Sequence, residues 1–132
     1  MPHLVVDGMN VIGARPDGWW RDRAGATRRL LARLQALHRA AGDPVTLVLD
    51  GRPLPDVPEG DHDGVQVLYA RRGGRDAADD RLVEFLRDLD EPGDVTVVTS
   101  DRGLRTRVRE LEATVVGAGN LLAQLDQVTG ST

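Results

Sequence analysis

The chain has 132 residues and no cysteine, so it is large enough to bury one core of its own, while disulfides, zinc–thiolate sites and thiol nucleophiles are excluded. Its basic residues are 17 arginines without a single lysine, which also excludes Schiff-base chemistry and the lysine of a phosphate-binding P-loop. A net charge of −4 argues against binding nucleic acid through a broadly basic surface, but is compatible with an arginine rim around an acidic, metal-neutralised centre.

Apolar runs typical of strands alternate along the chain with patterns typical of helices. The first strand is expected to end at Asp7, and the others to cover residues 45–49, 65–70, 95–99 and 114–116. Helices are expected over about 22–41, 76–89 and 102–112, with a last helical turn or two through Leu125. We expect one domain over residues 1–128 and a disordered tail over 129–132. No apolar run approaches the roughly 20 residues of a membrane span, and no signal peptide is recognisable, so we expect a cytoplasmic protein without a membrane partner.

Strands that are separated by helices of this length predict right-handed crossovers and a parallel sheet covered on both faces. The expected fold is therefore a three-layer α/β/α sandwich with a mainly parallel sheet of about five strands. A strand order of 3-2-1-4-5 would place the first and fourth strands side by side. Asp7 and Asp101 would then face each other at the edge where open α/β sheets bind ligands.

Aspartates stand at or directly after the ends of three of these strands: Asp7, Asp50 and Asp101. Two carboxylates about 5 Å apart repel by roughly 3 kcal/mol at an effective dielectric of 20, so a cluster of three needs a cation. Oxygen ligands without cysteine, and histidines outside the acidic positions, favour Mg²⁺ or Mn²⁺ over zinc. Each aspartate also has an ordinary structural interpretation, because Asp101 can cap the helix that follows it and Asp50-Gly51 can be a turn. Asp7 can also belong to a turn, but this interpretation is weaker because Gly8 and Asn10 crowd the same corner.

A second group of acids occurs at the start of the expected helix over 76–89. Asp76, Asp79 and Asp80 are spaced so that at least two can point at the same place. The same pattern is typical of an ordinary acidic helix start, with Asp76 as the N-cap. Both interpretations stay open from the sequence.

Three segments taken together resemble the NYN domain, in particular its YacP-like branch within the PIN-like nuclease group. They are Val-Asp-Gly-Met-Asn-Val-Ile-Gly at 6–13, Asp-Ala-Ala-Asp at 76–79 and Val-Thr-Ser-Asp at 98–101. The resemblance covers nearly the whole chain in order, and its first segment is the most specific. It implies a metal-dependent ribonuclease with the sandwich fold, acting on RNA and, in this branch, on messenger RNA in a translation setting.

The resemblance also assigns residues. Asp7, Asp79 and Asp101 would bind one or two Mg²⁺ or Mn²⁺ ions, Asn10 would accompany Asp7, and Asp76 would be a further catalytic acid. Asp50 and Asp80 are additional candidate ligands, and the choice between Asp79 and Asp80 stays open by one position. The expected reaction is metal-assisted hydrolysis of an RNA phosphodiester that leaves a 5′-phosphate.

Arginines near the acidic positions are candidates to bind the RNA backbone, and a polar or aromatic side chain beside them could contact a phosphate or a base. Trp19 or Trp20 could stack on a base, although at least one of them could equally pack against the fold. Ser100 could orient a water or a phosphate oxygen, and Arg105 is better explained as solvated surface. The RNA-binding candidates are Arg71, Arg72, Arg75, Arg102, Ser100 and Trp19.

Two other classes of protein that place acidic residues at this edge of the sheet fit poorly. A haloacid-dehalogenase-type phosphatase needs a second aspartate where this chain has Met9, and both it and a receiver domain need a lysine. The serious alternative is an RNA-binding or adaptor module that shares the fold and has lost turnover.

Overall fold

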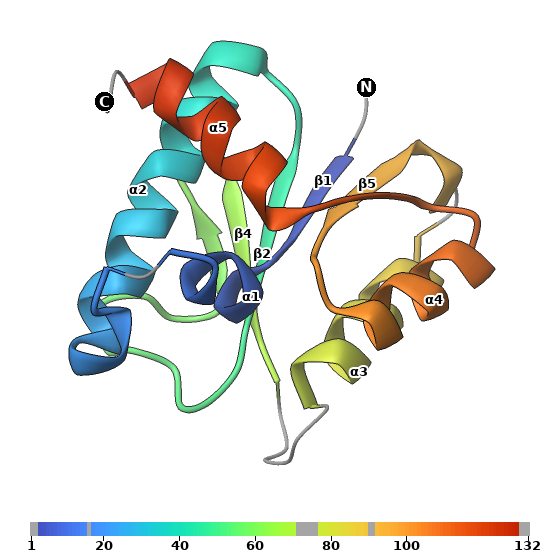
Figure 1. The fold of residues 1–132 in the computed structure, drawn as a ribbon, viewed down its shortest axis with the longest axis horizontal. Coiled ribbons are helices and arrows are strands. Elements are labelled where there is room, and N and C mark those ends of the chain that lie inside the picture. The colour runs from blue at the N-terminus through green and yellow to red at the C-terminus, as the bar shows by residue number, and fades with distance from the viewer. Residues whose placement is uncertain (1–2, 16, 71–76, 90–91, 130–132) are drawn as a thin grey trace.

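The structure is a computed structural model and describes residues 3–15, 17–70, 77–89 and 92–129. Its elements alternate between strands and helices along the chain (Figure 1). In chain order, with η for short 3₁₀ helices, they are β1 (His3–Asp7), α1 (Gly8–Gly13), η1 (Trp19–Arg21), α2 (Arg23–Ala41), β2 (Val45–Leu49), β3 (Gly60–His62), β4 (Val65–Tyr69), α3 (Ala77–Arg87), η2 (Pro92–Asp94), β5 (Val95–Val98), α4 (Arg102–Glu110), β6 (Thr114–Val116) and α5 (Ala118–Thr129).

One six-stranded sheet runs through the molecule in the order β3-β4-β2-β1-β5-β6. All neighbouring strands are parallel except β3, which pairs antiparallel with β4. The predicted order 3-2-1-4-5 is confirmed, because the predicted strands correspond in that order to β4, β2, β1, β5 and β6. The sheet has one strand more than predicted, because three residues of the loop after β2 form the edge strand β3.

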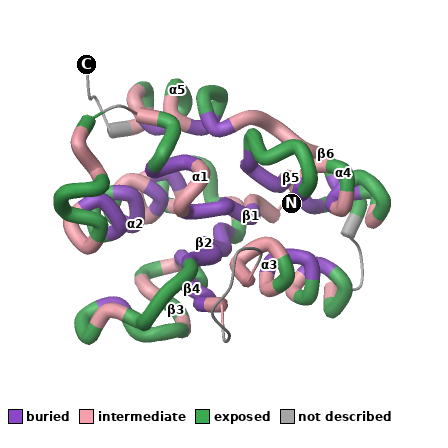
Figure 2. The backbone as a smooth tube through the Cα atoms, turned by 60° about the horizontal axis from the view of Figure 1, so that its bottom comes forward, coloured by how far each residue is buried: buried purple, intermediate pink, exposed green. Residues whose placement is uncertain are grey.

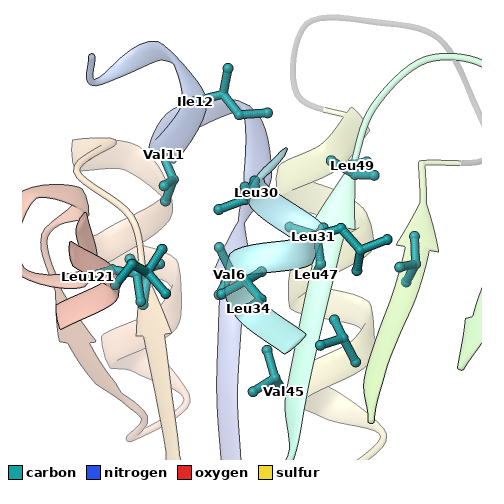
Figure 3. Close-up of a cluster of buried hydrophobic side chains, with 14 of the residues drawn as sticks. Val6, Val11, Ile12, Leu30, Leu31, Leu34, Val45, Leu47, Leu49 and Leu121 are labelled. Atoms are coloured by element: carbon teal, nitrogen blue, oxygen red, sulfur yellow. The ribbon is translucent and has the colours of Figure 1, made fainter. Parts of the chain in front are cut away.

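Helices cover both faces of the sheet, which confirms the three-layer α/β/α sandwich (Figures 1 and 2). Along β1, Val6 packs with α1, α2 and α5, whereas its neighbour Val5 packs with α3 and α4. β2 alternates in the same way, with Leu47 on the first face and Val48 on the second. Figure 3 shows the first of these two cores, in which Leu30 and Leu34 of α2 lie over Val6 and Leu47. Both faces of the central strands are therefore buried, as expected for a parallel sheet.

The long helix α2 has the start and stop that its sequence predicts. Asp22 caps its N-terminus by accepting a hydrogen bond from the backbone N–H of Gly25 at 2.9 Å. Gly42 ends it in the left-handed region at φ 79°. Ala41, the last residue of α2, is exposed because the chain turns away at Gly42.

Three parts of the chain differ from the sequence prediction. The short helix α1 follows β1 without a loop, and no helix was predicted there. The last helix, α5, has 12 residues instead of a turn or two, because Leu121 and Leu125 bury one side of it against α2 and α1. The predicted disordered tail lies outside the described residues except for Thr129, which ends α5. None of the described helices has the length and apolar character that a membrane-spanning helix requires.

Candidate active site

Asp7 is the last residue of β1 and lies at the centre of the carboxyl-end edge of the sheet. Its side chain is buried, with only 7% of the residue exposed, between β2 and β5. The hydroxyl of Thr99 donates a hydrogen bond to Oδ2 of Asp7 at 2.8 Å. Burial raises the pKa of the Asp7 carboxyl above its ordinary value of 3.8, the hydrogen bond from Thr99 lowers it, and the negative charge of nearby Asp101 raises it. Such a carboxylate is costly to keep ionised unless a cation lies near it.

Thr99 links the two aspartates that the strand order brings together. Its hydroxyl oxygen accepts a hydrogen bond from the backbone N–H of Asp101 at 3.1 Å while its proton goes to Asp7. Thr99 is fully buried at the end of β5. Sequence reasoning did not single it out, although a hydroxyl that ends a run of buried valines is the signal that could have done so.

Asn10 and Ser100 form a second connection, which joins α1, directly after β1, to the loop after β5. Oδ1 of Asn10, on α1, accepts a hydrogen bond from the backbone N–H of Ser100 at 2.8 Å. The hydroxyl oxygen of Ser100 in turn accepts one from the N–H of Ala118 at the start of α5. In this structure both side chains hold the loop between β5 and α4 in place, next to the acidic edge.

Asp101 and Asp50 lie at the same edge and are both exposed. Asp101 caps α4, with Oδ1 accepting a hydrogen bond from the N–H of Leu104 at 2.9 Å. The structural interpretation of Asp101 is therefore correct, but the cap needs only one of its two carboxylate oxygens. Asp50 follows β2, forms an ion pair with Arg23 at 3.5 Å, and also raises the pKa of Asp7 by its charge.

The acids of α3 are placed differently from one another. Asp80 is exposed and forms an ion pair with Arg107 of α4, with 2.8 Å between the charged atoms. Asp79 is half-buried in the first turn of α3, a helix that packs on β1 and β2. The ion pair orients Asp80 toward α4, and the choice between Asp79 and Asp80 as a metal ligand stays a prediction. Asp76 lies outside the described residues.

Within the described ranges, no three acidic or histidine side chains lie close enough together to hold a metal ion between them. The structure thus brings Asp101 and Asp50 within electrostatic reach of Asp7, and the assignment of Asp7, Asp79 and Asp101 as joint metal ligands stays a prediction. Mg²⁺ is commonly bound by one or two carboxylates together with water and substrate phosphate. The oxygen-only donors at this edge match that kind of site.

The candidate RNA-binding residues are two sets of arginines, one inside and one outside the described residues, and a tryptophan. Arg102 is exposed at the start of α4, beside Asp101, whereas Arg105 is half-buried. Trp19 is half-buried, with its ring packed on the first core and Arg23 above it at 5.9 Å from the ring centre. Trp20 is the exposed tryptophan, at 56%, so it is better placed than Trp19 to stack on a base. Arg71, Arg72 and Arg75 lie outside the described residues.

Two solved structures of Rae1 (YacP) from Bacillus subtilis share the architecture of this chain. A crystal structure of a mutant form of it has a TM-score of 0.81 to this chain at 22% sequence identity, with 98% of this chain and 78% of that chain covered. Another crystal structure of Rae1 gives a TM-score of 0.75 at 23% identity, covering 98% and 76%. No curated protein sequence matches the chain. The model of the YacP-like NYN domain matches residues 4–132, and since that match spans nearly the whole chain, the chain belongs to the YacP-like NYN domain family, a nuclease-type domain.

Proposed function

We propose that the chain is a Mg²⁺- or Mn²⁺-dependent ribonuclease that cuts single-stranded or messenger RNA endonucleolytically. The observation that carries the proposal is the buried carboxyl of Asp7, with a raised pKa, beside Asp101 in a chain of a nuclease-type family. The family branch makes messenger RNA in a translation setting the first substrate to test.

The donors at the edge fit a hard divalent cation. Asp7 and Asp101 offer carboxylate oxygens, and the charges of Asp101 and Asp50 make the ionised form of Asp7 costly without a cation. Asp7 and Asp101 would hold the ion, and Asp79, Asp76 and Asp50 would contact it directly or through water. When bound, the ion lowers the pKa of a coordinated water and offsets charge on the phosphate during attack.

The residues around Asp7 have positioning roles in this proposal. Thr99 fixes the orientation of the Asp7 carboxylate, because its hydroxyl proton is committed to Oδ2. Asn10 holds the loop that carries Ser100 and Asp101. Arg102, exposed at that loop, would contact a phosphate of the substrate.

The test is the incubation of purified protein with a 5′-labelled single-stranded RNA and Mg²⁺ or Mn²⁺, beside Asp7→Asn and Asp101→Asn. Asparagine is also a good helix N-cap, so Asp101→Asn removes the charge while keeping the cap of α4. We expect both variants to lose activity by about 100-fold or more, the scale seen when one group that stabilises a transition state is removed. Asp61→Asn, on the exposed edge strand β3, is the control and should cleave like the wild type. Cleavage without a metal, or full activity in both variants, would contradict the mechanism.

A second candidate function is an RNA-binding adaptor without turnover. It is favoured by the finding that, among the residues the structure describes, no three side chains already form a metal site. Binding of the labelled RNA with no cleavage under either metal would support the adaptor and reject the nuclease.

A further inference from the structure

A pocket of about 390 Å³ opens beside the acidic edge of the sheet. It lies between the end of β2, the start of α2 and the segment that follows β2. Leu49, Leu54 and Tyr69 contribute apolar walls, and Arg23, Asp50 and Arg52 contribute charged groups. The volume is in the range that small ligands occupy in proteins.

The chemistry of the lining selects among ligands. Leu49 and Tyr69 are buried and Leu54 is partly buried, so the interior suits a flat apolar group. Arg23 and Arg52 are exposed and positively charged, which suits a phosphate. Asp50 accepts hydrogen bonds of the kind that a ribose hydroxyl or a base amino group donates. One nucleotide carries all three features.

The outer wall of the pocket is fixed before any ligand binds. The hydroxyl of Tyr69 donates a hydrogen bond to the carbonyl of Val57 at 2.8 Å and accepts one from the N–H of Leu54 at 3.3 Å. Arg28 of α2 binds both carboxylate oxygens of Asp56, at 2.7 and 3.0 Å. Because this segment is already tied to β4 and α2, a ligand would not have to order it.

The pocket lies next to the candidate active site. Met9, which also lines it, comes two residues after Asp7, and Asp50 follows the strand that pairs with β1. Ala77, at the pocket, is the first residue of α3 and stands two positions before Asp79. A nucleotide in the pocket would therefore lie next to a phosphodiester at Asp7.

We propose that this pocket binds one nucleotide of an RNA strand, adjacent to the phosphodiester that is cleaved, with the base inside and its phosphate on Arg23 and Arg52. The proposal rests on the ribonuclease function above and adds a position at which the enzyme selects its substrate.

The first test fills the pocket. Ala24 lines it from the first turn of α2, so Ala24→Trp should block it, while Ala32→Trp on the exposed side of the same helix is the matched control. On a short single-stranded RNA with Mn²⁺, Ala24→Trp should raise KM by about tenfold or more, the loss expected when a stacked base is excluded, with kcat within about twofold. Sequencing of the 5′ ends from a random-sequence RNA should show a base preference at one position that Ala24→Trp removes and Ala32→Trp keeps. Unchanged KM and unchanged preference in Ala24→Trp would overturn the proposal.

A second test needs no turnover, and its main measurement uses the wild-type protein. Titration of ¹⁵N-labelled wild-type protein with the four 5′-mononucleotides should shift the amides of Leu49, Asp50 and Leu54. Arg52→Ala should weaken this binding several-fold, and Arg39→Ala, an exposed arginine near the end of α2, should not. Shifts confined to other parts of the molecule would overturn the proposal. If the mononucleotides bind here but the protein never cleaves RNA, the nucleotide site stands and the ribonuclease function fails.

Discussion

At the scale of single residues, the Asp7 carboxyl is a source of instability in the metal-free protein. Its pKa is raised in the folded state, so folding favours the protonated form. The stability of the folded state is then lost as the pH rises from the ordinary value of 3.8 through the raised pKa. Asp7→Asn keeps an oxygen that can accept from Thr99 but carries no charge. We therefore expect it to raise the melting temperature by a few degrees at pH 7 in EDTA, with the gain vanishing below about pH 4, as followed by circular dichroism.

Asp61→Asn serves as the control for this stability effect, because Asp61 is exposed on β3 and should show no comparable gain. A lower melting temperature for Asp7→Asn at pH 7 would mean that the ionised carboxylate stabilises the fold. The charge repulsion that motivates a metal site would then be absent.

Asp126 shows the opposite behaviour at the same scale. Hydrogen bonds from Arg15 and Arg33 hold the pKa of its carboxyl below the usual 3.8. A depressed pKa contributes stability that is present above pH 3.8 and is lost as the pH falls through the lowered value. Since Arg15 follows α1 and Arg33 is on α2, this carboxylate ties α5 to both. Asp126→Asn should therefore speed amide hydrogen exchange in α5 at pH 7, and the difference should shrink as the pH falls below 3.8. Equal exchange at pH 7 would contradict this role.

The site residues at the strand ends could be predicted because β-strand runs that stop at an aspartate are visible in the sequence. Asp7 and Asp101 were placed at one edge correctly by strand order alone. The partnership of Thr99 with Asp7 could not be predicted, because it depends on the register that pairs Val6 with Val98 and so sets the next residues side by side. Spacing alone also could not show that Asp80 forms an ion pair with Arg107 of α4.

At the scale of elements, the approach of α1 to the sheet depends on Gly8. A Cβ atom built at Gly8 would lie 2.9 Å from the backbone carbonyl oxygen of Val48 and 2.6 Å from the Leu49 side chain. The side chain of Leu49 can move, but the carbonyl of a central strand cannot. Gly8→Ala should lower the free energy of unfolding by about 1–3 kcal/mol, the usual cost of overpacking a core, in urea titrations. Because α1 carries Asn10, RNA cleavage should fall as well.

Gly119→Ala is the matched control for this element. Gly119 lies in the first turn of α5 with nothing within 4 Å of a Cβ atom there. Alanine should therefore stabilise that helix, by about 0.5–1 kcal/mol at most. Equal effects of the two substitutions would show that α1 is not held by close contact at Gly8.

The same glycine explains why α1 was missed in the sequence. A helix of six residues that begins with Gly-Met-Asn has no apolar period to detect, and it forms because tertiary packing buries Val11 and Ile12. β3 is another element set by context, since it exists only as the antiparallel partner of β4. The five predicted strands and the helices with a clear apolar face could be recognised from the sequence without such context. Their order and approximate bounds were predicted correctly.

At the scale of the whole molecule, a net charge of −4 limits how RNA can be held. The net negative charge opposes binding of a polyanion, so we expect the affinity to come from arginines near the carboxyl-end edge of the sheet. Among the described residues these are Arg23, Arg52 and Arg102. An acidic protein that binds RNA through a small cationic rim should contact few phosphates and release few counterions.

This argument gives a quantitative salt dependence. For single strands the affinity falls with a log–log slope of about 0.7 per phosphate contact, so the three described arginines account for a slope of about −2. Each further contact made by Arg71, Arg72 or Arg75, the other predicted RNA-binding arginines, would make the slope steeper by about 0.7. Asp7→Asn, which should bind without cleaving, allows the slope to be measured by fluorescence anisotropy with a labelled single-stranded RNA.

Adding Arg102→Ala should reduce the magnitude of the slope by about 0.7, because one phosphate contact is lost. Arg109→Ala, exposed at the far end of α4, should leave the slope unchanged, since that end points away from the edge where α4 begins. Equal slopes for the Arg102 and Arg109 variants would mean that RNA does not cross the start of α4, and the path of the strand past Asp101 would have to be abandoned.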